Sequence, residues 1–392
     1  MPTTVDACPG VVTLHPARDG HVARIRLPGG YVSGRQWTAL AGLAGEFGDG
    51  DLNLTARGNV QLRGLPPAAA AALARRAARA GLLPSGAHDR SRNITASPLA
   101  GLGGRPPLRR LVRALDAAIV ADPGLAALPG RFLFAVDDGS GSAALAASDI
   151  GLRRAGQQVE VIIAGRLAGL RLPVPAAVQA AVTAAQAAVA RGIGALVTRI
   201  ADLADGGAGV AAAIGGSLGD QVAATDARLP LGPIGAAGST VGGARGGCLP
   251  ETVLVAAAPL GRLSRGQATL IGGLLRAGEV LRLGTAGRVV IPHALTPAAA
   301  VASLAGSGLL TSDSDELAGV TACSGTACLR AVADVRALAR PLPGLPRTHW
   351  AACPRGCGRP PDADLVVAAG PDSFLVPGQP TALPVALLGG AS

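Results

Sequence analysis

Residues 52–64, LNLTARGNVQLRG, have a counterpart 229 residues later at 281–293, LRLGTAGRVVIPH. The leucines of the two stretches coincide, and each stretch is typical of a strand, a bend and a second strand. Repetition over so long an interval predicts a chain built from two related halves.

The elements predicted around each copy follow the same order. Around the first copy they are a strand at 21–31 and helices at 36–47 and 66–82. Around the second copy they are a strand at 252–257, a helix at 264–277 opened by the N-cap residue Ser264, and a helix from 297 onward. The order β-α-β-β-α indicates a ferredoxin-like unit in each half.

The remaining segments complete an α+β chain. We predict helices at 105–121 and 175–197, strands at 131–136 and 159–164, and, after residue 318, a helix at 329–340 and a strand at 365–369. The predicted divisions are a first ferredoxin-like half at 10–85, an α/β domain at 86–200, a Gly/Ala-rich linker at 201–247, a second ferredoxin-like half at 248–315 and a cysteine-bearing domain at 316–392.

The composition excludes several classes of protein. Hydrophobic residues make up 49% of the 392 residues and charged residues 15%, which excludes a disordered chain. A membrane span needs about 20 nearly uncharged apolar residues. The longest candidate, 175–197, carries Gln179, Gln186 and Arg191 and is therefore predicted to be an amphipathic helix. The first ten residues show neither a basic nor an apolar signal region, so we expect a cytoplasmic protein with no membrane partner.

The charge indicates an anionic partner. The net charge is +10, and none of the 35 basic residues is lysine. Arginines spread along the whole chain can bind nucleic acid, an anionic cofactor or a polyanionic substrate. No run of basic residues or interleaved aromatic residues is present, so we expect no nucleic-acid partner.

Four of the six cysteines form two close pairs. Four residues separate Cys323 from Cys328, and three separate Cys353 from Cys357. Two thiol pairs can surround zinc or an iron–sulfur cluster, and four buried free thiols are the third possibility. The glycines of AACPRGCGRP (351–360) let the backbone fold closely around an inorganic core and favour a cluster. The isolated Cys8 and Cys248 are interpreted as structural thiols.

Further segments make the chain resemble the nitrite/sulfite reductase superfamily over most of its length. These segments are RIRLPGGYVSGRQW (24–37), LNLTARGNVQLRG (52–64), SRNITASPLAG (91–101), LPGRFLFAVDD (128–138), TACSGTAC (321–328) and AACPRGCGRP (351–360). The resemblance implies two pseudo-symmetric halves, each a ferredoxin-like domain plus an α/β domain that binds a cluster or a tetrapyrrole. It also implies a [4Fe–4S] cluster on the four paired cysteines, although the family usually places five residues between the first two.

The resemblance also implies a set of ligand-binding residues. The family's Thr-x-Arg-x-x-x-Gln strand matches Thr55, Arg57 and Gln61, and Arg63 is expected on the same strand face. Arg26, Arg92 and Arg131 match basic groups of the reductases that bind small anions, Asn93 follows Arg92, and Leu133 stands where a second lysine is usual. The expected substrate-binding residues are therefore Arg26, Arg57, Gln61, Arg63, Arg92, Asn93 and Arg131, and no catalytic residue is assigned.

Within the superfamily the chain is most similar to the precorrin-3B synthases. The residues that support this likeness are Cys8-Pro9-Gly10, RFLFAVDDGSG (131–141), PLGRL (259–263) and Arg355 inside the last cysteine pair. The likeness implies a monooxygenase of aerobic cobalamin (vitamin B12) biosynthesis, which uses O₂ to hydroxylate precorrin-3A and close a γ-lactone. It also implies an additional iron, and reduced ferredoxin or a flavin reductase as electron donor. The alternatives are a siroheme-dependent nitrite or sulfite reductase and a Cys₄ metal protein that binds nucleic acid.

Overall fold

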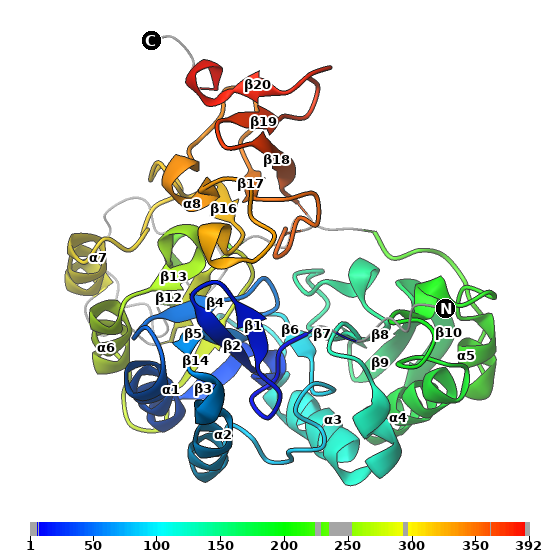
Figure 1. The fold of residues 1–392 in the computed structure, drawn as a ribbon. Coiled ribbons are helices and arrows are strands. Elements are labelled where there is room, and N and C mark those ends of the chain that lie inside the picture. Colours follow the sequence, from blue (N-terminus) through cyan, green and yellow to red (C-terminus); the bar gives the residue numbers. More distant parts are fainter. Residues whose placement is uncertain are drawn as a thin grey trace.

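The computed structural model describes residues 6, 8–223, 229–234, 253–292, 297–360 and 362–388. Four five-stranded sheets and the helices around them organise these residues (Figure 1). The predicted α+β class is confirmed. No helix within the described ranges is long and apolar enough to cross a membrane.

Sheet 1 is antiparallel and belongs mainly to the first half. Its strands, in spatial order, are β1 (His15–Ala17), β2 (Gly20–Ile25), β5 (Val60–Leu65), β4 (Leu52–Leu54) and β13 (Arg262–Leu263). The helices α1 (Gly34–Phe47) and α2 (Ala70–Arg79) pack on each other, and α1 also packs on β5.

Sheet 2 repeats this plan in the second half. Its strands, in order, are β11 (Gly232–Ile234), β12 (Val253–Ala257), β15 (Arg288–Ile291), β14 (Val280–Leu283) and β3 (Tyr31–Ser33). Its helices are α6 (Arg265–Gly273) and α7 (Pro297–Gly306).

The two halves exchange one strand each. Strand β3 comes from the first half but pairs with β14 of sheet 2, and β13 comes from the second half but pairs with β4 of sheet 1. Helices α1 and α6 pack together, and both halves contribute to one apolar core. Neither half therefore has a complete sheet without the other.

The helices α1 and α6 begin in the same way. Ser33 and Ser264 are their N-cap residues, and each accepts a hydrogen bond from the backbone N–H of a glutamine three residues later. In turn, the glutamine side-chain oxygen accepts a hydrogen bond from the N-cap backbone N–H, which forms a capping box in both helices. The predicted N-cap role of Ser264 is confirmed.

Sheet 3 lies between the two ferredoxin-like segments in the sequence. Its strands, in order, are β10 (Arg166–Leu172), β9 (Gln158–Ile163), β8 (Ile150–Ala155), β7 (Phe134–Asp137) and β6 (Ile94–Ala96). The helices that follow or flank it are α3 (Arg109–Ala121), α4 (Val174–Ala190) and the short α5 (Ala208–Ala213). Strands β6, β7 and β8 are parallel, whereas β8, β9 and β10 are antiparallel.

Sheet 4 is the cysteine-bearing counterpart of sheet 3. Its strands, in order, are β16 (Val320–Ala322), β17 (Thr348–Ala351), β18 (Asp364–Gly370), β19 (Ser373–Leu375) and β20 (Leu383–Pro384). The first three are parallel and the last three antiparallel, which is the order of directions found in sheet 3. In Figure 1 this sheet stands above the ferredoxin-like part, with the loops after β16 directed toward β1.

Three local predictions are corrected. The helix expected at 329–340 is reduced to α8 (Val335–Leu338), because Val332 N–H donates to Ala352 O at 3.1 Å and Asp334 caps a new start. The long helix expected at 175–197 ends at residue 190, before the left-handed turn at Gly192 (φ +96°). The segment 21–31 is expected to be a strand closed by a Pro-Gly-Gly turn; the turn is present at Pro28–Gly30, but the strand before it ends at Ile25.

The predicted linker at 201–247 contains regular structure where it is described. Helix α5 lies within it, and β11 joins the edge of sheet 2. The rest of the linker after residue 234, with Cys248, lies outside the described residues.

Candidate functional site

The two cysteine pairs meet at one edge of sheet 4. Cys323 directly follows β16, and Cys353 lies two residues beyond the end of β17. Because β16 and β17 are parallel neighbours, their carboxyl ends reach the same edge and bring the loops of Cys328 and Cys357 together. Burial raises the pKa of the Cys357 thiol, Arg355 lowers it, and the other three paired cysteines raise it further. The other three thiols are therefore close enough to Cys357 to act on its charge.

The paired cysteines do not form a ready zinc site. Zinc holds thiolates at about 2.3 Å, so a ready zinc site has sulfurs within roughly 4 Å of one another. Among the described residues, no three Cys, His, Asp or Glu side chains are placed to hold one metal ion. Four thiolates can hold zinc or an iron–sulfur cluster, so the backbone around them is the further evidence on which kind of metal centre they fit.

Backbone groups also converge on this edge. The Sγ atom of Cys323 accepts hydrogen bonds from the N–H groups of Gly325 at 3.4 Å and Ala352 at 3.3 Å, and such bonds tune cluster potentials in proteins. Gly356 and Gly358 have φ values of +55° and +90°, so the close turn predicted from the glycines is present. The residues therefore fit a [4Fe–4S] cluster.

His349 supports the last cysteine loop. Its Nδ1 lies 3.0 Å from Thr321 Oγ1, and its Nε2 lies 3.2 Å from the backbone oxygen of Cys357. Burial lowers the pKa of His349 to about 4. Both ring nitrogens are engaged, so we assign His349 to positioning the loop that carries Cys357.

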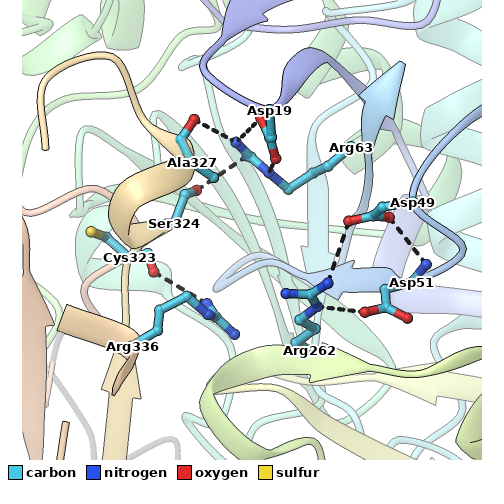
Figure 2. A network of polar contacts seen from close by, with 9 residues as sticks. All are labelled: Asp19, Asp49, Asp51, Arg63, Arg262, Cys323, Ser324, Ala327 and Arg336. Atoms are coloured by element: carbon cyan, nitrogen blue, oxygen red, sulfur yellow. Dashed lines mark hydrogen bonds and ion pairs between the residues drawn. The ribbon is translucent and has the colours of Figure 1, made fainter. Parts of the chain in front are cut away.

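A cavity of about 690 Å³ opens beside the cysteines. Cys323 and Cys357 border it on one side. On another side are Arg24 and Gln61, and Gln61 accepts a hydrogen bond from Arg24 Nη2 at 2.6 Å when its amide is oriented for bonding. Arg336 also lines this cavity and donates to Cys323 O at 3.2 Å (Figure 2).

A second cavity of about 760 Å³ lies next to the first, since Ala56 lines both. Three arginines from distant parts of the sequence line it: Arg57, Arg199 and Arg359. Apolar residues, including Leu133 and Leu283, form much of the remaining wall. No aspartate or glutamate of the described chain lines either cavity.

Both copies of the internal sequence repeat contribute residues that line the two cavities. Residues 54–56 and 286–287 line the first cavity, and their counterparts 283–285 and 57–58 line the second. The repeat predicted from the sequence thus contributes matching turns to two adjacent cavities.

Two of the predicted ligand-binding residues line the cavities. Arg57 lines the second, where burial, together with the charge of nearby Arg199, lowers its pKa to about 10. Arg57 lies in the turn before β5 and not on the strand, which corrects the expected strand face shared with Gln61 and Arg63. Gln61 lines the first cavity.

Arg26 is buried close to this region. Its side chain is 2% exposed, and Nη2 donates to Gly130 O at 3.2 Å. Its Nε and Nη1 find no partner within the described structure. Burial, together with the charge of neighbouring Arg24, lowers the pKa of Arg26 to about 9, so an anion beside it would offset an unfavourable positive charge.

Arg63 instead connects sheet 1 to the first cysteine loop. It forms a two-pronged ion pair with Asp19, with N···O distances of 2.8 and 3.0 Å. It also donates to Ser324 Oγ at 3.2 Å and Ala327 O at 3.1 Å (Figure 2). These contacts satisfy the guanidinium group and hold the loop between Cys323 and Cys328.

The other predicted residues do not line either cavity. Arg92 is buried and forms a two-pronged ion pair with Asp116 at 2.7 and 2.8 Å. Asn93 is buried and donates to Phe132 O at 2.9 Å. Arg131 is exposed, and its backbone oxygen accepts a hydrogen bond from Arg57.

Sequence reasoning missed four arginines of the cavities. Arg24 lies on β2, two residues before Arg26, and Arg359 lies two residues after Cys357. Their closeness in sequence to predicted site residues could have indicated them. Arg199 and Arg336 lie in segments with no such signal.

Comparison with known proteins agrees with the predicted superfamily. Residues 15–80 match the family described as nitrite/sulfite reductase ferredoxin-like half domain. Over 127 residues the chain is 35% identical to a ferredoxin--nitrite reductase of Synechococcus elongatus, which covers 30% of this chain and 25% of that protein. A ferredoxin--nitrite reductase of Leptolyngbya laminosa is 34% identical over 135 residues, 32% of this chain and 26% of that protein.

One further sequence likeness and one likeness of fold were found. Over 44 residues the chain is 48% identical to the sulfite reductase [NADPH] hemoprotein beta-component of Acidithiobacillus ferrooxidans, 11% of this chain and 8% of that protein. The NirA protein of Mycobacterium tuberculosis has a similar fold, with a TM-score of 0.69, 19% identity, and coverage of 93% of this chain and 73% of that chain. The sequence matches thus span about a quarter or less of the curated relatives, whereas the fold likeness spans nearly the whole chain.

Proposed function

We propose that this chain, a relative of the nitrite and sulfite reductases, is an oxidoreductase that holds a [4Fe–4S] cluster and binds a tetrapyrrole with several carboxylate groups. The observation that carries the proposal is the charge of the adjacent cavities. Five arginines and no carboxylate of the described chain line them, and two of the paired cysteines border one. A ring with acetate and propionate groups supplies the missing negative charge.

The chain's own residues bind and orient in this proposal. Cys323, Cys328, Cys353 and Cys357 hold the cluster. Arg57 and Arg359 take carboxylates of the ring, and the apolar wall around Leu133 packs against the ring itself. Arg199 also lines this cavity, but its charge is partly offset by its ion pair with Asp149 at 2.8 Å. When bound, the cluster supplies single electrons and the tetrapyrrole site uses them.

Reduction of nitrite or sulfite is the reaction that the comparisons support best. The tetrapyrrole is then siroheme, and the names of two relatives favour reduced ferredoxin as the electron donor. The unpaired N–H groups of buried Arg26 are suited to a small anion.

Precorrin-3B synthesis is the second candidate, because a specific observation favours it. Of the four positions that the resemblance aligns with the anion-binding set of the reductases, Arg26 alone has buried N–H groups without an acceptor in the described part of the chain. Arg92 is satisfied by Asp116, the side chain of Arg131 is exposed, and Leu133 is apolar. In this reaction precorrin-3A is the substrate, O₂ takes up two electrons and two protons, one oxygen atom enters the macrocycle and the other leaves as water. An additional iron is the expected site of O₂ use, and a flavin reductase is a further possible donor.

Anaerobic purification followed by metal, sulfide and absorption analysis tests the shared part of the proposal. We expect about four irons and four sulfides per chain for one cluster, and binding of a polycarboxylate porphyrin that weakens as salt rises. Zinc in place of iron and sulfide, or no porphyrin binding, contradicts it.

Activity assays then separate the two reactions. The cluster-loaded protein is supplied with siroheme and assayed for nitrite and sulfite reduction with a strong chemical reductant. In parallel it is supplied with precorrin-3A, O₂ and reductant, and the products are analysed by mass spectrometry. Turnover of either anion with bound siroheme supports the reductase, whereas a product heavier by one oxygen atom supports the synthase.

A further inference from the structure

Cys8 lies against the buried guanidinium group of Arg26. A Cβ atom added to Gly130 would lie 2.6 Å from Cys8 Cβ, 2.8 Å from Arg26 Nη2 and 3.4 Å from Asp6 Oδ2, so all three side chains flank the same backbone position. The Asp6 carboxylate is itself paired with Arg90 at 3.4 Å. Burial lowers the pKa of Arg24, and the neighbouring thiols of Cys8 and Cys357 partly offset this effect. Arg24, which lines the first cavity, therefore has Cys8 and a paired cysteine as neighbours.

The segment that carries Cys8 is fixed by two aspartates. Asp89 Oδ2 accepts hydrogen bonds from the N–H groups of Val11 at 2.5 Å and Val12 at 2.8 Å. Asp6 accepts from Gly130 N–H at 2.5 Å and from Cys8 N–H at 3.2 Å. Side-chain acceptors thus hold both ends of this short segment beside Arg26.

Arg26 independently points to a ligand. It is 2% exposed, and its Nε and Nη1 have no acceptor within the described structure. Buried N–H groups without an acceptor are rare, because they lose water and gain nothing in exchange. An anionic group of a ligand satisfies them.

We propose that the Cys8 thiol is a ligand-contacting group that binds, together with Arg24 and Arg26, one anionic group of the bound molecule. This inference rests on the proposed function and adds a residue to its site, in place of the structural role expected for an isolated cysteine. The anionic group is a carboxylate arm of the tetrapyrrole or a small oxyanion.

The protonation state of the thiol agrees with this role. Burial raises the pKa of Cys8, neighbouring Arg24 and Arg26 lower it, and the Asp6 carboxylate raises it again. A thiol that stays protonated donates an S–H hydrogen bond to an anion, whereas a thiolate would repel it.

Protection of Cys8 from alkylation tests the proposal. The cluster-loaded protein is treated with iodoacetamide, and Cys8 is followed in the tryptic peptide 1–18, in which it is the sole cysteine and Arg18 the first cleavage site. Uroporphyrin III is the carboxylate probe and nitrite the oxyanion probe. A probe at about ten times its dissociation constant should slow alkylation roughly tenfold.

The comparison of the two probes identifies the kind of anionic group that is bound. Protection by uroporphyrin III alone assigns a carboxylate, and protection by nitrite assigns a small oxyanion. If neither probe changes the rate, the inference is overturned. Porphyrin absorption measures porphyrin binding separately from alkylation. Bound porphyrin without protection by either probe would refute the role of Cys8 and leave the proposed function intact. If porphyrin does not bind, the proposed function is refuted, and the nitrite experiment still tests the role of Cys8.

Substitution gives a second measurement. Cys8→Ala should weaken binding of the protecting probe by about three- to tenfold, and Cys8→Ser, which keeps a donor, should stay within about twofold. The matched control is Arg76→Gln, which changes an exposed arginine paired with Glu46. Equal affinities for the alanine variant and the wild type would contradict the proposal.

Discussion

Replacement of Arg63 by alanine separates two roles for this residue. The sequence motif places it among the ligand-binding arginines, whereas the structure surrounds it with protein acceptors. Its guanidinium group bonds to Asp19, Ser324 and Ala327, and its side chain is 8% exposed. In the Arg63→Ala variant the loop between Cys323 and Cys328 loses its attachment to sheet 1.

The magnitude follows from these contacts. The bonds to Ser324 and Ala327 are charged hydrogen bonds, which contribute about 1.5–3 kcal/mol each. The Asp19 carboxylate is 30% exposed, so solvent screening limits that pair to about 1 kcal/mol. Since contacts of one side chain are not additive, we expect a loss of about 2–4 kcal/mol in the free energy of unfolding.

Urea unfolding of the cluster-loaded protein measures this loss, and iron analysis after gel filtration measures cluster retention. We expect both to fall in Arg63→Ala, with porphyrin affinity unchanged in the fraction that keeps its cluster. The control Arg76→Ala removes an ion pair whose side chains are 54% and 41% exposed, and it should change stability by less than about 0.5 kcal/mol. If Arg63→Ala were as stable as this control but bound porphyrin more weakly, Arg63 would be a ligand-binding residue and the structural argument would be refuted.

Three other substitutions test the site. Cys353→Ser should remove the visible absorption of the cluster and most of the iron, and a full iron and sulfide content would exclude Cys353 as a ligand. Arg57→Gln should weaken uroporphyrin III binding by about 10–150-fold through loss of a charged contact, measured by absorption titration, and an unchanged affinity would remove Arg57 from the site. Arg92→Ala should destabilise the fold by about 3 kcal/mol, because it leaves the Asp116 carboxylate without its partner, and urea unfolding checks this. Weaker porphyrin binding in Arg92→Ala at unchanged stability would support instead the ligand-binding role that the sequence predicts.

The parts of the fold that depend on local pattern were predictable. The bend between β4 and β5, the helix α1 and the capped start of α6 follow from residues within a few positions of each other. The exchange of β3 and β13 between the halves was not predictable, because it depends on pairings such as Leu263 with Leu52, which are distant in sequence. The helix expected at 329–340 failed for the same reason, since the contact of Val332 with Ala352 overrides local helix preference.

In the candidate site, too, some residues could be predicted from local sequence and others could not. Close spacing was enough to find the paired cysteines, because a loop of three or four residues keeps two thiols near each other. The arginines were harder, since their role depends on which acceptor each one meets after folding. Arg92 meets Asp116, Arg63 meets Asp19 and the unpredicted Arg199 meets Asp149, whereas Arg359 donates to the backbone oxygen of Ala363. Arg199 and Arg359 also reach a cavity wall.

The two α/β sheets explain why we expect a single cluster. Ser97 directly follows β6 in the sequence Thr-Ala-Ser, as Cys323 directly follows β16 in Thr-Ala-Cys, so Ser97 stands where the other half has Cys323. Ser97 Oγ donates to Asp137 Oδ2 at 2.9 Å, and the same carboxylate accepts hydrogen bonds from the N–H groups of residues 139, 141 and 143. The loop at this edge is thus closed by its own hydrogen bonds and offers no thiol, whereas the matching edge of sheet 4 carries four. Duplication of the fold supplied two equivalent edges, and the side chains that follow the strands make only one of them suitable for a cluster.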